Sequence, residues 1–112
     1  MRHPEFDVLT ASWELALQAD GYAENTVKVY RAAVRSLADW LAEQHPEVGP
    51  VELDRDHVRG WLVHVRQTRS SSTARGWFPG VRHFARWLQS EARLTGTPPP
   101  GSGRHRQATR WA

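Results

Sequence analysis

The chain has 112 residues, a length at which roughly 65% of the unfolded surface can be buried, so we expect one domain. It contains no cysteine, which excludes both disulfides and thiolate metal sites. No apolar run approaches the ~18 residues that span a bilayer, and no signal-peptide core follows the N-terminus. We therefore expect a cytoplasmic protein with no cofactor, no membrane contact and no small-molecule substrate.

The net charge of +3 is distributed unevenly along the chain. Residues 1–65 carry six Lys/Arg against eleven Asp/Glu, a net charge of −5, whereas residues 66–112 carry nine Arg against Glu91 alone, a net charge of +8. A basic half is suited to a polyanionic partner. The alternative is an ordinary solvated surface in an Arg-rich protein, because Arg outnumbers Lys fourteen to one.

The first half of the chain predicts two helices. Over residues 7–19, Leu9, Trp13 and Leu17 recur on one face, and Gly21 is placed to end this helix in the left-handed conformation. A second amphipathic pattern covers residues 25–44, with Asn25 as its expected N-cap. A proline- and glycine-containing stretch, residues 46–50, then breaks the helical pattern.

The second half predicts two more helices and a tail. Residues 54–67 form an apolar face behind Asp54, a capping residue, and the serines at 70–72 cap a fourth helix that reaches about Glu91. Pro79 lies inside this fourth helix. We favour one continuous, kinked helix over a helix that starts near Pro79. Residues 95–112 predict a Pro/Gly-rich linker and a basic tail, mobile from about Thr97.

The fourth helix separates apolar from basic residues. Its apolar set falls within about 60° of the helical wheel, and Arg75, Arg82 and Arg86 gather within about 40° on the opposite side. On the second helix, Lys28 and Arg31 lie with Arg35 about 135° from the apolar centre. A guanidinium group donates two parallel hydrogen bonds, which suits phosphates and guanine edges. A plain solvated face remains the alternative for each helix.

An ordered set of short motifs resembles the N-terminal domain of tyrosine site-specific recombinases, the phage integrase and Xer-type family. The set comprises Glu24-Asn25-Thr26 with Tyr30, Trp40-Leu41, Ser72-Thr73, and Phe84-Ala85-Arg86-Trp87-Leu88. The resemblance covers about residues 5–94, which we take as the domain. Two features depart from it: Pro79, and the Pro-Gly tail where the family usually has an Asn-Pro step into its catalytic domain.

The resemblance implies an all-α, four-helix (SAM-like) orthogonal bundle of two crossed hairpins that clamps double-stranded DNA. In the family the second and fourth helices face the DNA. The positions carried over are Thr26, Lys28 and Arg31 on the second helix, and Ser72, Thr73, Arg75, Arg82 and Arg86 on the fourth. Other recombinase protomers are possible partners. The family's catalytic residues belong to a separate C-terminal domain that this sequence lacks, so we expect no enzyme activity and assign no catalytic residue.

Three patterns are interpreted as structural. His83 and Arg86 spell His-x-x-Arg, a catalytic box of the family, but they stand in the part that resembles the N-terminal domain. Tyr30 lies on an apolar stripe, which favours a core role over a nucleophile. His57 and His64 are seven residues apart with no third ligand nearby, so we predict no metal site.

The predicted core joins the two hairpins, and the competing functions follow from the same residues. We expect Trp40, Trp61, Phe84 and Trp87 or Leu88 to pack together where the hairpins cross. Duplex DNA binding is the leading function. The alternatives are a helical protein-interaction module, using Trp77 or Trp111 to dock a partner helix, and an inactive truncated integrase remnant.

Overall fold

The computed structural model describes residues 4–94, with side chains described through Glu91. Its four α-helices are α1 (Pro4–Ala19), α2 (Glu24–Gln44), α3 (Arg55–Thr68) and α4 (Ser71–Leu94). A short 3-10 helix, η1 (Pro50–Glu52), lies between α2 and α3, and residues 4–94 contain no strand. The predicted all-α, four-helix fold is confirmed. The predictions for residues 95–112 lie outside the described residues.

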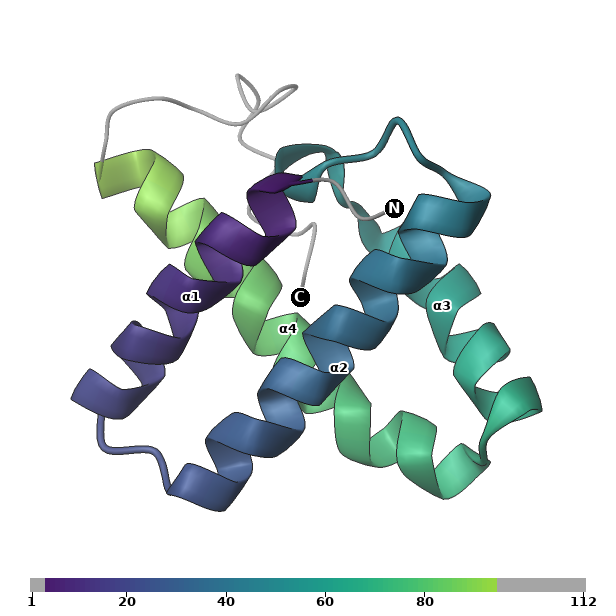
Figure 1. The fold of residues 1–112 in the computed structure, drawn as a ribbon, viewed down its shortest axis with the longest axis horizontal. Helices are drawn as coiled ribbons and strands as arrows, with labels where there is room; N and C mark the ends of the chain where they lie inside the picture. The colour runs from purple at the N-terminus through teal and green to yellow at the C-terminus, as the bar shows by residue number, and fades with distance from the viewer. Residues whose placement is uncertain (1–3, 95–112) are drawn as a thin grey trace.

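The helices form two hairpins that cross (Figure 1). The α1–α2 hairpin and the α3–α4 hairpin meet where α2 passes in front of α4, with α1 and α3 on opposite sides of the view. At this crossing the two backbones approach closely, because a Cβ on Gly80 would lie 2.9 Å from Tyr30 Cα. A glycine on α4 therefore sets the distance between the two central helices.

The C-terminal end of α1 and the N-terminal start of α3 follow from the local sequence, as predicted. Gly21 has φ 85°, and the amides of Gly21 and Tyr22 donate to the carbonyls of Gln18 and Leu17, a Schellman motif that ends α1. Asp54 caps α3, because its carboxylate accepts from the His57 amide at 3.0 Å while the Asp54 amide donates to His57 Nδ1 at 3.1 Å. Both caps could be predicted from the sequence, because glycine is typical just after a helix and aspartate just before one.

The starts of α2 and α4 differ from each other. The Asn25 N-cap was a wrong prediction: α2 begins at Glu24, and its N-cap, Ala23, offers no side-chain hydrogen bond. The α4 cap falls within the predicted serine run, where Ser70 Oγ accepts from the Thr73 amide at 2.9 Å. From there α4 continues to Leu94 with the exposed Pro79 inside it, so one continuous helix is confirmed and a start near Pro79 is wrong.

Aromatic rings fill the core in two groups. Between α1, α2 and α4, Trp13 stacks on Tyr30 at 6.1 Å between ring centroids and meets the edge of Phe84 at 5.1 Å. Between α3 and α4, Trp61 stacks on Trp77 at 6.3 Å. The Trp13 and Trp61 side chains are fully buried, so each hairpin contributes one tryptophan to the centre.

The predicted core residues are only partly as expected. Trp61 and Phe84 are fully buried, whereas the side chains of Trp40, Trp87 and Leu88 are half-buried and pack against the core from its edge. Trp40 covers Gly60, where an added Cβ would lie 2.8 Å from Trp40 Cη2. All of the predicted core residues belong to one core cluster or pack against it, and Phe84 stacks on Trp87 at 6.1 Å between ring centroids, but the close approach of α2 and α4 is made by Tyr30 and Gly80.

Candidate nucleic-acid interface

The first turns of α2 and α4 lie along one edge of the domain. Figure 1 shows both helices beginning at the lower edge, beside the ends of α1 and α3. The first amides of a helix have no partner within it and carry a partial positive charge, which favours anions. The Ala23 cap leaves these amides without a side-chain acceptor at α2. Because α1 and α3 end at this edge with the opposite partial charge, the helix dipoles largely cancel there, and the case for phosphate binding rests on the side chains.

The predicted residues on α2 are placed unequally for DNA contact. Thr26 is half-buried and Lys28 is exposed, with its Nζ 3.7 Å from Glu24 Oε1. Arg31 instead bonds to α1, since its Nη1 donates to Glu14 Oε1 at 2.9 Å. Arg31 thus ties the first hairpin together, and a phosphate would have to compete with Glu14 for it.

The start of α4 brings hydroxyls and one guanidinium to the same edge. Ser72 is exposed, whereas the Thr73 hydroxyl oxygen accepts from Ser70 Oγ at 3.0 Å and so takes part in the cap. Arg69, just before the helix, places its guanidinium carbon 5.1 Å from the Trp77 ring centroid. Arg69 was missed as a site residue because only folding sets its guanidinium against the Trp77 ring.

The three arginines of α4 extend this surface along the helix. Arg75 and Arg86 are exposed and Arg82 is half-buried. Each lies about 120–160° around α4 from Gly80, so none points at α2. Arg75 borders a groove with Arg59 and Arg66 of α3, neither of which was a predicted site residue. Their seven-residue spacing on one flank of α3 was the available signal.

The basic groups of α2 and α4 do not meet, because α2 begins at the lower left of the view and α4 at the lower right, with the crossing of the two helices between them (Figure 1). Lys28 lies about 160° around α2 from Tyr30, the residue that touches Gly80. Arg82 lies about 160° around α4 from Gly80, so it also points away from the crossing. Both helices therefore lie between the Lys28 and Arg82 side chains. The continuous part of the surface runs from the edge at Arg69 along α4, joined by the arginines of α3.

His83 has a structural role in the His-x-x-Arg pair. Trp13 Nε1 donates to His83 Nδ1 at 2.9 Å, and the Tyr22 ring packs edge-on against the imidazole at 5.4 Å. Burial lowers the pKa of His83 from its ordinary value, partly offset by the negative charge of Asp20. The ring is an acceptor in the packing of α1 on α4, which agrees with its interpretation as structural.

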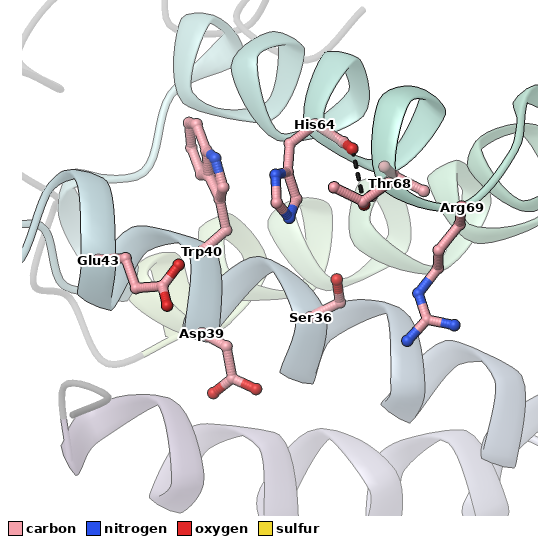
Figure 2. A pocket seen from close by; sticks show the side chains of 8 residues that line it. Ser36, Asp39, Trp40, Glu43, His64, Thr68 and Arg69 are labelled. Atoms are coloured by element: carbon pink, nitrogen blue, oxygen red, sulfur yellow. Dashed lines mark hydrogen bonds between the residues drawn. The ribbon is translucent and has the colours of Figure 1, made fainter.

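A polar groove lies between α2 and α3 (Figure 2). Asp39 and Glu43 of α2 line it together with His64 and Arg69, and Figure 2 shows the Asp39 carboxylate directed away from α3. The Thr68 hydroxyl donates to the His64 carbonyl at 2.8 Å. Two carboxylates against one guanidinium make this groove a poor phosphate site. His57 does not line this groove, and its ring centroid lies 5.4 Å from that of His45. Within residues 4–94, no three His, Cys, Asp or Glu side chains are grouped so that they could hold a metal ion.

The fold and this surface define a small all-α domain of two crossed hairpins with basic, hydroxyl-bearing helix starts. The family model for the N-terminal SAM-like domain of phage integrase matches residues 9–93, so the chain belongs to this family. The chain matches no curated protein and no solved structure. No helix in the described part is long and apolar enough to cross a membrane.

Proposed function

We propose that the chain binds double-stranded DNA as the N-terminal clamp domain of a tyrosine recombinase, in the cytoplasm and without cutting DNA itself. The observation that carries this proposal is the shared edge at which α2 and α4 begin (Figure 1). Lys28, Ser72 and Arg75 are exposed there or within one turn of it. Family membership supports the proposal, because the matching domain is that of phage integrase.

The basic surface has the dimensions of a backbone contact. Arg75 and Arg86 are eleven residues apart, which corresponds to about 16 Å along α4. Phosphates on one strand of B-DNA advance about 3.4 Å each along the axis, so the row spans several of them. These groups offer mainly phosphate contacts, and we therefore expect binding with little sequence preference and a strong dependence on salt.

The protein-interaction alternative gains little from the placement of its tryptophan. Trp77 stacks on Trp61 and lies under the Arg69 guanidinium, so its faces are already in contact with this chain. Trp111, the other candidate anchor, lies outside the described residues. Trp77 is therefore not free to insert into a partner in the way that this alternative requires.

The test is fluorescence anisotropy with a labelled duplex of about 20 base pairs over a salt series. We expect binding at low salt that weakens as a linear function of log salt, with a slope of about −0.9 for each phosphate contact. A single strand of the same length is the comparator, and it should bind more weakly. No binding to the duplex at low salt would refute the proposal.

A further inference from the structure

Arginines of α3 and α4 border a single groove, which we call the arginine groove. Arg59 and Arg66 line it from α3, and Arg75 lines it from α4. All three side chains are exposed, and no acidic residue is among the described residues that line this groove. Figure 1 shows α3 and α4 as the two arms of one hairpin, so tertiary packing brings these guanidinium groups to the same surface.

The start of α2 has no comparable surplus of positive charge. Lys28 Nζ lies 3.7 Å from Glu24 Oε1, and Arg31 Nη1 donates to Glu14 Oε1 at 2.9 Å. Each of these two cations therefore has a carboxylate partner on its own hairpin. A phosphate that approached this start would also meet the negative charge of both carboxylates.

The arginine groove is less balanced by carboxylates. Asp56 lies beside it, with 3.6 Å between its Oδ1 and Arg59 Nη1 and both side chains largely exposed. Arg69, in the connection between α3 and α4, adds a fourth guanidinium to this hairpin. Together these four guanidiniums and one carboxylate carry a net charge of +3. The α3–α4 flank is therefore a better match for a polyanion than the start of α2.

The floor of the arginine groove is apolar. Val63 of α3 is 51% exposed and lines the groove together with Phe78 of α4. Apolar side chains suit the thymine methyl groups that a duplex presents in its major groove. The Ser71 hydroxyl, at the start of α4, borders the same groove and can donate to a phosphate oxygen. The lining thus fits both the backbone of a duplex and the groups beside it.

The spacing of the arginines on α3 fits a DNA strand. Arg59 and Arg66 are seven residues apart, which corresponds to about 10.5 Å along the helix. Phosphates of one strand advance about 3.4 Å each along the duplex axis, so the two guanidiniums are about three phosphates apart. A strand that follows the groove can therefore contact both α3 arginines and reach Arg75 on α4.

We infer that the duplex contact continues from the start of α4 onto α3, and that Arg59 and Arg66 hold the backbone of one strand along the arginine groove. The inference rests on the proposed function, because it takes duplex DNA as the ligand. It departs from the expectation carried over from the family, in which the second helix accompanies the fourth on the DNA. In this chain α3 makes a larger contribution than α2, because Lys28 and Arg31 already have carboxylate partners.

The test measures binding of the labelled duplex by single-alanine variants over a salt series. Arg59→Ala and Arg66→Ala should each weaken binding about tenfold at low salt, and each should flatten the slope of log K against log salt by about 0.9. Arg35→Ala is the matched control, because Arg35 is an exposed arginine of α2 that does not line the groove, and its loss should be smaller. Helical circular dichroism should be unchanged in all three variants, since the positions are exposed and alanine favours helices.

A second pair of variants is expected to strengthen binding, a result that impaired folding does not imitate. Asp56→Asn removes the carboxylate beside Arg59, and Glu24→Gln removes the one beside Lys28. The two carboxylates are equally exposed, at 88%, and each lies in the first turn of its helix. Both changes remove one negative charge, yet Asp56→Asn should raise the affinity more, by up to about fivefold.

The outcomes separate the inference from the proposed function. If the parent binds the duplex and both Arg59→Ala and Arg66→Ala bind like the parent, the inference is overturned and the proposed function stands. The same conclusion follows if Arg35→Ala and Glu24→Gln show the larger effects, because the duplex would then lie against α2. A parent that does not bind the duplex at low salt overturns both.

Discussion

Gly80 on α4 packs directly against Tyr30 on α2, and a Cβ at position 80 would lie 2.9 Å from the Tyr30 backbone Cα. A side chain can rotate away from such a contact, but a backbone atom moves only if the whole helix shifts. The two hairpins can therefore cross this closely only because residue 80 has no Cβ.

Gly80→Ala should destabilise the domain, with a loss of about 1–3 kcal/mol in the free energy of unfolding from overpacking. Gly76→Ala, one turn earlier on the same helix, is the control, because a Cβ there would meet nothing within 4 Å. It should stabilise by about 0.5–1 kcal/mol through helix propensity. Urea melts of both variants provide the measurement, and changes of equal sign would contradict this view of the crossing.

Phe84→Ala should cost more stability than Trp40→Ala. Phe84 is fully buried among rings of α1 and α4, so its removal leaves a cavity and should cost about 3–5 kcal/mol. Trp40 is half-buried at the edge, where solvent can fill the space it leaves. Thermal melts that rank the two variants in the opposite order would show that the core is centred between α2 and α3.

The sequence predicted what depends on local chemistry. The four helices, the Asp54 cap and the left-handed Gly21 follow from side-chain patterns within a few residues. Tertiary relationships were less accessible. The exact depth of Trp40 and the approach of Tyr30 to Gly80 depend on how the hairpins cross, which periodicity does not encode.

In the candidate nucleic-acid interface, too, local features could be predicted and tertiary ones could not. Wheel geometry predicted that Arg75 and Arg86 would be exposed, as they are. It did not predict that Arg31 would bond to Glu14, because an ion pair between two helices depends on their relative placement. Arg59 and Arg66 join Arg75 only through the packing of α3 on α4.

His83 should make stability depend on pH below its ordinary pKa of 6.5. Burial lowers the pKa of His83 in the folded state, with Asp20 opposing and Arg86 adding to this effect, so the unfolded chain takes up the proton more readily. Unfolding should therefore become easier as the pH falls below 6.5. The proton would also occupy the nitrogen that accepts from Trp13.

His83→Asn is the variant that isolates this effect. The Asn amide oxygen occupies about the position of His83 Nδ1, so it can still accept from Trp13 Nε1, but it does not titrate. Urea melts between pH 5 and 7 should show a smaller loss of stability in the variant than in the parent. Parallel curves for the two proteins would mean that other groups cause the pH dependence.

Arg31 and Glu14 should show coupling in a double-mutant cycle. Their pair is partly exposed, so the coupling should be at most about 1 kcal/mol. Glu14→Gln should also strengthen duplex binding slightly, since it frees Arg31 for phosphate. Zero coupling in melts would show that the two side chains do not hold α1 on α2 in solution.

The last prediction concerns the arginine row of α4 and duplex binding. Arg75→Ala and Arg86→Ala should each weaken binding, and each should flatten the slope of log K against log salt by about 0.9 per lost phosphate contact. Arg104→Ala, a change outside the described residues, is the comparison, and it should have a smaller effect because Arg104 does not belong to the arginine row of α4. Folding should be unaffected by either α4 substitution, since both side chains are exposed.

Arg75 is within one turn of the shared edge and Arg86 is about 16 Å farther along α4, so the pair also measures how far the contact extends. A loss at Arg75 alone would confine the DNA to the helix starts. Equal losses at Arg86 and Arg104 would mean that undirected charge, and not an oriented helix face, holds the duplex.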